Sequence, residues 1–521
     1  MASGDDRRVP IRRALLSVDD KTGLEALARR LLTHPIQIWA TEGTRLALAS
    51  AGVPTQPAEQ LTGIGAWFGG RIKTLHPGIL GGILAPGTPE GDRELATRGL
   101  HRIDLVVVNL YPFERRQAEG ADRSHLIEAI DIGGVTLARA AAKNHSAVTV
   151  VTDPSEYDEV AQALDDHDGA IPFELRARLA AAAFRRTSEY DRRIAGALAA
   201  PEPPGAFPAQ LGFDREPISL RYGENPHQKA AVYRFHALGT SPMAPAPFRL
   251  LKGDSLSFTN LLDLETALGI VSEFPDPTAA VVKHATPCGV ACGPTAREAL
   301  ESAVATDPVA RYGCVIALNR PLTSSDLDAL HGIFVDLLAA PSVDPSALEL
   351  LGKRPKLKVV EVAPPDPARP RWEAHSALGR LLLQEADRRQ LVPGELRSVT
   401  TRTATPAQAS SLEFAWRVVR HAKSNAVVLA QGARAVGIGG GQPTRVKAVE
   451  LAVQVAGDRA KGSVLASDAF FPFADGVEVA GAAGVAAILQ PGGSLRDPEV
   501  IEAAERHQIA MYFTGWRVFR H

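Results

Sequence analysis

The sequence predicts an α/β protein with more than one domain. Short apolar runs alternate with helical patterns along most of the chain, as they do in βαβ units. A chain of 521 residues is also too long for a single hydrophobic core. The segment 201–210 holds four prolines in ten residues and indicates a linker between two regions.

In the first 200 residues we expect a parallel sheet. The candidate strands are "RALLSV", "IQIWAT", "DLVVVNLYPF" and "SAVTVVTD", and the helical pattern "TGLEALARRLL" separates the first two. Continuously apolar strands are typical of a parallel sheet that is covered on both faces. An Ala- and Arg-rich helical stretch, 172–200, closes this region.

Beyond the linker, 211–521 resumes the α/β alternation, with strands expected at "AAVVKHA", "CVIALN", "KLKVVEV", "SVLAS" and "AMYFTG" among others. The run "AVVLAQGARAVGIGG" predicts a hairpin that turns at Gly432. The loop-like "PPDPARPR" indicates two subdomains that split near 364–375. We find no clear sequence repeat.

The bulk properties argue against several classes of function. A net charge of -2 gives no general field for nucleic acid or an anionic membrane. No apolar run is long enough to span a bilayer, and the first residues lack a signal-peptide pattern. Three cysteines exclude a disulfide framework, so we expect a cytoplasmic protein.

The stretch "AVVKHATPCGVACG", 280–293, could hold a metal, a thiol nucleophile or a Lys-His pair. Zinc deaminases need H-x-E and P-C-x2-C, whereas here no Glu follows His284 and three residues separate Cys288 from Cys292. We expect these cysteines to be small buried residues in a turn and a following helix. Lys283 and His284 end an apolar strand, at the sheet edge where α/β enzymes build sites.

In the N-terminal region, polar residues follow the ends of the expected strands. Helix N-termini after "RALLSV" and "IQIWAT", with a basic loop at 71–76, could bind a phosphate. Ordinary helix capping and a solvated basic loop are the alternative. Tyr111, Asp131 and Lys143 could serve proton transfer.

Taken together, the motifs show a resemblance to a known family. They are "SVDDKTGL", "GGRIKTLHP", "VVVNLYPF", "DIGGVTLARAAAKNH", "RYGENPHQ", "VVKHATPCGVA", "KSNAVV", "GIGGGQPTRV", "ASDAFFPFADG", "QPGGS" and "RVFRH". In this order they resemble the bifunctional purine biosynthesis enzymes that join AICAR (5-aminoimidazole-4-carboxamide ribonucleotide) transformylase to inosine monophosphate (IMP) cyclohydrolase.

The resemblance implies a methylglyoxal-synthase-like cyclohydrolase domain at 1–200 and a transformylase region at 211–521. The latter would consist of two cytidine-deaminase-like α/β subdomains without zinc. It further implies 10-formyltetrahydrofolate as cosubstrate and a homodimer with transformylase sites at the interface. A monovalent cation such as K+ is a further candidate ligand.

The same resemblance implies roles for individual residues. His284 would be the general base on the 5-amino group of AICAR, while Lys283 would stabilise charge or help to protonate the folate nitrogen. Residues implied to bind the substrates of formyl transfer are Arg221, Tyr222, Asn225, Gly313, Asp336, Asn425, Arg445, Phe470, Asp475, Ser494 and Arg517.

For ring closure of the formylated ribonucleotide (FAICAR), the resemblance implies Lys143 in proton transfer. Asp131, Tyr111 and Lys73 would surround the reacting atoms. Residues implied to bind the nucleotide and its phosphate are Ser17, Lys21, Thr41, Gly43, Thr44, Arg71 and Thr74.

The chain departs from the family pattern at several positions. Asp19 and Glu42 place acids beside the expected phosphate site, where they should oppose anion binding. Leu80, Arg311 and Tyr312 also differ from the residues usual in the family. These departures keep open an enzyme with transformylase activity alone. A regulatory nucleotide-binding module and a zinc protein are more distant alternatives.

Overall fold

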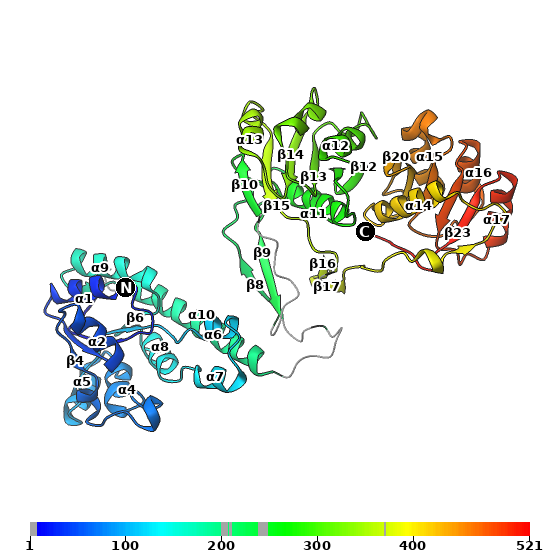
Figure 1. Ribbon diagram of the computed structural model, residues 1–521. Helices are drawn as coiled ribbons and strands as arrows, with labels where there is room; N and C mark the ends of the chain where they lie inside the picture. The colour runs from blue at the N-terminus through cyan, green and yellow to red at the C-terminus, as the bar shows by residue number, and fades with distance from the viewer. Residues whose placement is uncertain (1–7, 200–206, 208–210, 238–247, 369–370) are drawn as a thin grey trace. The chain divides into compact units, whose positions relative to one another are not determined.

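The computed structural model describes residues 8–199, 207, 211–237, 248–368 and 371–521 (Figure 1). The chain divides near Leu211 into two compact units, called unit 1 (N-terminal) and unit 2 (C-terminal) below. Apart from Phe207, the proline-rich segment 201–210 lies outside the described residues. Each unit is an α/β structure with its own sheet.

Unit 1 contains a five-stranded parallel sheet in the order β4-β3-β2-β5-β6. Its strands are β2 (Arg13–Ser17), β3 (Gln37–Ala40), β4 (Gln56–Pro57), β5 (Leu105–Val108) and β6 (Thr149–Val151), and a separate antiparallel pair joins β1 (Val9–Pro10) to β7 (Ala170–Ile171). The four strands expected from the sequence are β2, β3, β5 and β6. The predicted parallel sheet is therefore confirmed.

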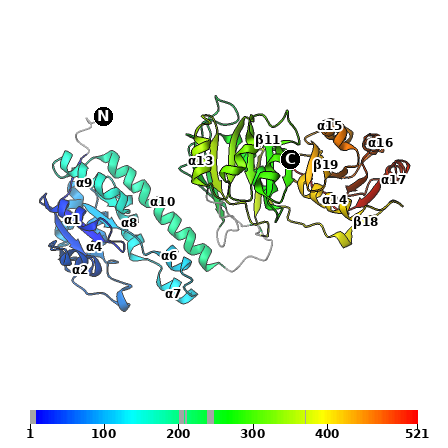
Figure 2. The ribbon, with the colours of Figure 1, turned by 45° about the horizontal axis from the view of Figure 1, so that its top comes forward.

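Helices cover both faces of this sheet. They are α1 (Leu24–Leu32), α2 (Glu42–Ser50), α3 (Glu59–Thr62), α4 (Pro77–Leu84), α5 (Pro89–Thr97), α6 (Phe113–Ala118), α7 (Arg123–Glu128), α8 (Gly133–Lys143), α9 (Tyr157–Asp166) and α10 (Phe173–Leu198). Leu16 of β2 packs in one core with α1 and α9, and Leu15 packs in the other with α4 and α8. The long helix α10 lies against α8 and β6 (Figure 2). Burial on both faces explains why the strands are continuously apolar.

Unit 2 contains a mixed sheet of twelve strands in the order β10-β15-β14-β13-β11-β12-β20-β19-β21-β22-β23-β18. The strands are β10 (Phe248–Lys252), β11 (Thr278–Lys283), β12 (Thr286–Cys292), β13 (Cys314–Leu318), β14 (Val335–Ala340), β15 (Lys358–Val362), β18 (Arg397–Ser398), β19 (Val427–Gln431), β20 (Arg434–Gly439), β21 (Val464–Ser467), β22 (Ala487–Gln490) and β23 (Ala510–Phe513). The main helices are α11 (Phe258–Ser272), α12 (Ala296–Val304), α13 (Pro345–Gly352), α14 (Pro406–Val419), α15 (Arg445–Ala456), α16 (Asp475–Ala482) and α17 (Asp497–Arg506). The hairpin predicted at Gly432 is confirmed as β19–β20.

The twelve strands form two halves with the same topology, although the sequence shows no clear repeat. From the centre outward, β12-β11-β13-β14-β15-β10 of the first half corresponds to β20-β19-β21-β22-β23-β18 of the second. In both halves two antiparallel pairings are followed by two parallel ones and a final antiparallel one. Unit 2 is therefore an internally repeated fold.

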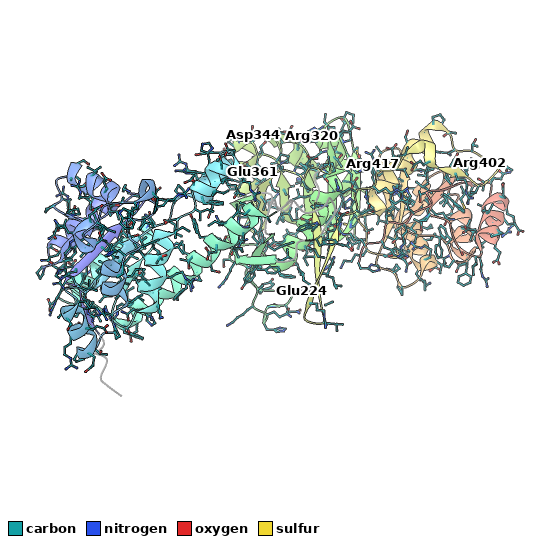
Figure 3. All side chains as sticks on the ribbon, turned by 90° about the horizontal axis from the view of Figure 1, so that it is seen from below. Glu224, Arg320, Asp344, Glu361, Arg402 and Arg417 are labelled. Carbon is teal, nitrogen blue, oxygen red and sulfur yellow. The ribbon has the colours of Figure 1, made fainter. Side chains whose placement is uncertain are left out.

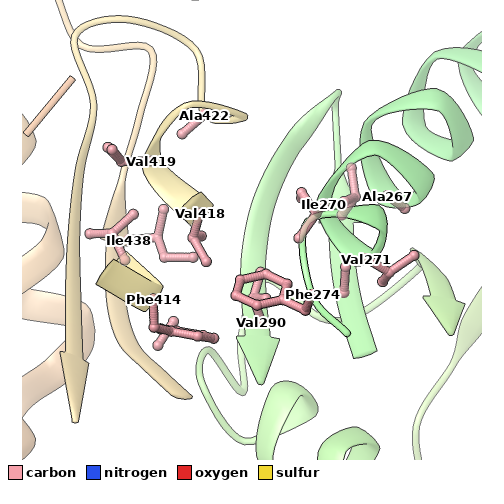
Figure 4. Packing of buried hydrophobic residues seen from close by; sticks show 14 of the residues in the cluster. Ala267, Ile270, Val271, Phe274, Val290, Phe414, Val418, Val419, Ala422 and Ile438 are labelled. Carbon is pink, nitrogen blue, oxygen red and sulfur yellow. The ribbon is translucent and has the colours of Figure 1, made fainter. Parts of the chain in front are cut away.

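The halves are joined by backbone pairing and by an apolar contact. Strand β12 pairs antiparallel with β20, with Ala291 opposite Arg434. The equivalent helices α11 and α14 lie on the same face, and one buried apolar cluster includes residues of both (Figure 4). Within it the rings of Phe274 and Phe414 are 5.3 Å apart, centroid to centroid. The halves thus share the core on this face of the sheet.

A buried polar cluster lies at the same junction. Glu273, directly after α11, accepts a hydrogen bond from Nε2 of His421 at 3.0 Å and pairs with Arg420 at 3.4 Å. Arg417 of α14, which is labelled in Figure 3, donates a hydrogen bond to the backbone carbonyl of Glu273 at 2.9 Å. Burial alone would raise the pKa of Glu273, but the bond from His421 and the charges of His421, Arg420 and Arg417 outweigh it and lower that pKa from 4.5. Burial lowers the pKa of His421 from 6.5.

We predict that Glu273→Gln destabilises the protein by about 2 kcal/mol at pH 7, because it leaves the buried guanidinium of Arg420 with only the half-exposed carboxylate of Asp387 as an ionic partner. A carboxyl whose pKa is lowered in the folded state stabilises above its unfolded pKa and loses this contribution as pH falls through the folded value. The gap between wild type and variant in urea unfolding should therefore close below about pH 4.5.

The matched control is Glu413→Gln, which removes a partly exposed i,i+4 pair with Arg417. It should change stability by about 0.5 kcal/mol or less. Equal losses for the two variants would show that the junction does not depend on Glu273.

Candidate active sites

In unit 1, the carboxyl ends of β2, β3 and β5 surround a cavity of about 150 Å³. Its lining residues are Ser17, Val18, Asp19, Lys21, Thr41, Gly43, Thr44, Lys73, Thr74, Asn109, Tyr111, Asp131 and Gly134. Parallel strands direct the residues that follow them to the same end of the sheet, which is why segments distant in sequence meet here.

One side of the cavity carries groups suited to proton transfer. Lys73 Nζ donates to Tyr111 Oη at 3.2 Å. Asp131 Oδ1 accepts the N–H of Gly134 at 2.7 Å, and the N–H of Asp131 donates to Tyr190 Oη at 2.8 Å. Burial raises the pKa of Asp131 despite hydrogen bonds from backbone amides and the charge of Lys73. A carboxyl, a lysine and a phenol that line one cavity are side chains that general acid–base catalysis uses.

The other side is suited to an anion. The side chain of Thr41 does not cap α2, so the first amides of this helix have no partner within it. Lys21 lies nearby, where its ammonium bonds the carbonyls of Val18 and Asp19. Burial lowers the pKa of Lys21. Thr44 Oγ1 accepts the N–H of Val18 at 3.1 Å and so fixes the loop after β2 against α2.

Two predicted residues lie outside this cavity. Arg71 is exposed and forms an ion pair with Glu128. Lys143 is the exposed last residue of α8, roughly 13 Å along the helix from Gly134. In this chain Lys143 therefore lies at the far end of α8 from the cavity, and its role in proton transfer stays a prediction.

The two acids that depart from the family pattern differ in their position relative to the cavity. Asp19 lines the cavity, whereas Glu42, the first residue of α2, does not.

Asn109 is a lining residue that the resemblance did not supply. Its Oδ1 accepts the N–H groups of Asp19 at 2.5 Å and Asp20 at 3.0 Å. The signal for it was the polar end of the strand "VVVN".

In unit 2, the predicted site residues gather at one end of the twelve-stranded sheet. Strand β11 ends there at Lys283, and the antiparallel neighbours β12 and β13 begin there. In the second half β20 ends at this end, and so do β21, β22 and β23. A Cβ on Gly440, after β20, would lie 3.3 Å from Thr286 Cγ2, so the two halves touch at this point.

Lys283 and His284 occupy the tip of the β11–β12 hairpin. Lys283 pairs with Thr286, and the two turn residues, His284 and Ala285, both have φ of 54°. Positive φ at both positions defines the tight turn that suits two twisted strands. Lys283 Nζ donates to the carbonyl of Tyr312 at 2.8 Å, and the side chain of His284 is exposed. The N–H of Ala285 donates to Asp263 Oδ1 at 2.5 Å.

The second half contributes a buried ion pair, Arg445 with Asp468. Arg445, at the start of α15, forms an ion pair with Asp468 and donates to Asn425 Oδ1 at 2.8 Å. The amide of Asn425 donates to the carbonyl of Gln442 at 2.8 Å. Among the described residues, Arg445 Nε and Asp468 Oδ2 are buried without a hydrogen-bond partner. Such atoms are available to a ligand or an ion.

Further predicted residues of the first half lie at the same end. Asp336 accepts from Lys358 Nζ at 2.8 Å and from Asn260 Nδ2 at 2.7 Å. Gly313, with φ of 73°, precedes β13 next to the carbonyl that holds Lys283.

Arg221 and Tyr222 lie beside the start of α11, where Phe258 N–H donates to the carbonyl of Tyr222 at 3.4 Å. Asn225 bonds Gln228 in an exposed loop. Four other predicted residues follow the parallel strands of the second half: Phe470 and Asp475 after β21, Ser494 after β22 and Arg517 after β23.

The cysteines lie on strands, which corrects the expected turn and helix: Cys288 and Cys292 belong to β12, the return strand of the hairpin. Burial raises the pKa of both thiols, that of Cys292 to about 11. Such thiols are poor nucleophiles at neutral pH. Among the residues that the structure describes, no group of three His, Cys, Asp or Glu side chains could hold a metal ion.

Comparison with known proteins identifies the family of this chain. The family model described as "AICARFT/IMPCHase bienzyme" matches residues 141–455, and that of the MGS-like domain matches 23–136. Proteins named bifunctional purine biosynthesis protein PurH are similar over nearly the whole chain. That of Desulfitobacterium hafniense (strain DSM 10664 / DCB-2) is 44% identical over 98% of this chain and 100% of its own length. That of Chelativorans sp. (strain BNC1) is 43% identical over 98% of both. The chain therefore belongs to the family of bifunctional AICAR transformylase/IMP cyclohydrolase enzymes, and unit 1 contains its MGS-like domain.

Proposed function

We propose that the shared end of the twelve-stranded sheet performs formyl transfer and that the cavity of unit 1 performs ring closure. The chain is a bifunctional enzyme of purine biosynthesis, with AICAR formyltransferase and IMP cyclohydrolase activities. The observation that carries this assignment is the position of the Lys283–His284 turn beside the segments that hold Asn425 and Arg445. The proposed domains are 1–200 for ring closure and 211–521 for formyl transfer, joined by 201–210.

In formyl transfer, His284 accepts a proton from the 5-amino group of AICAR while that nitrogen attacks the formyl carbon of 10-formyltetrahydrofolate. Lys283 stabilises the negative oxygen that develops on this carbon, or protonates the folate nitrogen as its bond to carbon breaks. The products are FAICAR and tetrahydrofolate. Arg445, Asn425 and the other residues at this end of the sheet bind and orient the substrates.

In ring closure, the carboxamide nitrogen of FAICAR attacks the formyl carbon, and the formyl oxygen leaves as water. Asp131 takes one proton from the attacking nitrogen, the formamide nitrogen loses a second, and both leave with the formyl oxygen as water. Lys73 and Tyr111 donate hydrogen bonds to that oxygen as it departs. Lys21, Thr44 and the start of α2 bind the phosphate. The roles predicted for Lys143 in proton transfer and for Arg71 in nucleotide binding stay predictions, since both residues lie outside this cavity.

A pair of substitutions tests this division. His284→Ala should lower kcat for formyl transfer by about 100-fold or more, because it removes the general base. It should leave ring closure of supplied FAICAR within about twofold of wild type. Asp131→Asn, which retains an acceptor for Gly134 N–H, should have the reverse effect. Each variant is the control for the other, and both activities are measured on the purified full chain.

Full formyl transfer by His284→Ala would contradict the assignment of the base. Failure of the wild-type protein to form IMP from FAICAR above the uncatalysed rate would instead leave a transformylase alone. The acid to examine in that case is Asp19, which lines the cavity.

A homodimer is supported by exposed apolar side chains on two antiparallel ribbons of the described chain. One ribbon is β8 (Leu211–Arg215) with β9 (Tyr233–Ala237), and it exposes Phe213 and Tyr233. The other is β16 (Trp372–Ala377) with β17 (Arg380–Glu385), where Leu378 is 91% exposed. Sedimentation equilibrium should give the mass of two 55.3 kDa chains. A monomer with full formyl-transfer activity would contradict sites at a dimer interface.

A monovalent cation such as K+ is supported by Asp468 Oδ2, which is buried and lacks a hydrogen-bond partner within the described part of the chain. Replacing choline chloride by potassium chloride at constant ionic strength should raise the rate of formyl transfer and leave ring closure unchanged. Equal formyl-transfer rates in the two salts would contradict the cation site.

No helix among the described residues is long and apolar enough to cross a membrane. The described part of the chain also contains three free cysteines. Together with its small-molecule substrates, the free thiols support a cytoplasmic location. Fractionation of cells that produce the protein would test this location, and recovery outside the cytoplasmic fraction would contradict it.

A further inference from the structure

Asp263 lies on α11, directly behind the turn that carries His284. Helix α11 packs against β11, β12 and β13, so it forms the surface on which this hairpin rests. The bond from Ala285 N–H to Asp263 Oδ1 is 2.5 Å long. Another side-chain hydrogen bond at the turn, from Thr286 Oγ1 to the carbonyl of His284, is 3.4 Å long and correspondingly weak. Asp263 therefore makes the main side-chain contact that fixes the turn.

This turn needs such a contact because neither of its residues is glycine. His284 and Ala285 both have φ of 54°, a conformation that costs an ordinary residue roughly 1–2 kcal/mol. The equivalent hairpin of the second half turns at Gly432, which adopts φ of 58° without a Cβ. Glycine cannot replace a residue that must carry an imidazole. A charged acceptor on the backbone amide of the turn offsets part of the conformational cost instead.

The carboxylate of Asp263 also interacts electrostatically with the imidazole of His284. Burial raises the pKa of Asp263, while the charge of His284 lowers it, which places the two groups within electrostatic reach of each other. The neighbouring carboxylate, Asp336, is already paired with Lys358 and Asn260. The cation of Lys283 is held by the carbonyl of Tyr312. Asp263 is thus the acid available to stabilise His284 when that ring gains a proton.

We propose that Asp263 is a positioning residue of formyl transfer: it holds the His284–Ala285 turn and stabilises the protonated imidazole. The inference rests on the proposed role of His284 as general base and adds the residue through which that base is oriented. Asp263 touches the backbone of the turn and acts on the reaction through His284.

The test compares Asp263→Asn, which keeps an acceptor for the Ala285 amide but removes the charge, with Asp263→Ala, which removes both. Asp263→Asn should lower kcat for formyl transfer by about 10-fold or more, since the imidazolium loses its counter-charge. KM for AICAR should stay within about twofold, because substrate contacts are unchanged. Asp263→Ala should lose more activity than Asp263→Asn. Ring closure of FAICAR in unit 1 and thermal unfolding serve as internal controls and should match wild type for Asp263→Asn.

Glu265→Gln is the matched control. Glu265 is an exposed residue of the same helix that pairs with Arg371 at 3.4 Å, and its substitution should leave formyl transfer unchanged. A double-mutant cycle with His284→Ala separates an indirect role from an independent one. If Asp263 acts through His284, Asp263→Asn adds no further loss in the His284→Ala background.

Wild-type kcat in Asp263→Asn would overturn the inference, and so would an equal loss in the presence and absence of His284. Loss of both activities with a lowered melting temperature would show a general structural role and would overturn it as well. Full formyl transfer by His284→Ala is a separate result, because it would refute the proposed base whatever Asp263 does.

Discussion

The junction between the two halves of unit 2 is the constraint on which the formyl-transfer site depends. One antiparallel pairing, β12 with β20, aligns the two sets of strands, and the packing of α11 on α14 fixes their relative position. Because β11 ends where β19 begins along this sheet, the Lys283–His284 turn and the Asn425–Arg445 cluster are brought to one end of it. A shift of the halves past each other would separate the proposed base from the proposed nucleotide contacts.

The repeated topology of unit 2 explains how one site can use two unlike halves. In the second half Asp468 accepts the N–H of Ala426 and pairs with Arg445, whereas the corresponding place in the first half has Asn319, which accepts the N–H of Thr278. Both contacts join the start of one strand to the residue that follows a neighbouring strand, but only the contact of Asp468 contains charged groups. The halves have therefore kept a common backbone arrangement while differing in the chemistry of their strand ends.

The sequence predicted β2, β3, β5 and β6 of unit 1, most strands of the unit 2 sheet and the hairpin at Gly432, because apolar runs and a glycine turn are local signals. It did not predict β4, β10 or β18. It did not predict the β11–β12 hairpin, because His284 and Ala285 are not turn residues and Asp263, which holds them, is distant in sequence. For the same reason β12, with its proline and glycine, was expected to be a turn and a helix.

The resemblance supplied most residues that line the unit 1 cavity. It also supplied Lys143, which lies at the far end of α8 from this cavity. It did not supply Asn109, which lines the cavity. The repeat was not found because topology depends on the pattern of apolar residues and not on their identity.

The most direct test of this account is a crystal structure of the full chain with AICAR bound. The account predicts that the 5-amino nitrogen lies within about 3 Å of the His284 imidazole, directly or through one water, while the ribonucleotide also contacts Asn425 or Arg445 of the second half. AICAR bound at the opposite end of the twelve-stranded sheet, or held by residues of one half alone, would contradict a site built from both halves.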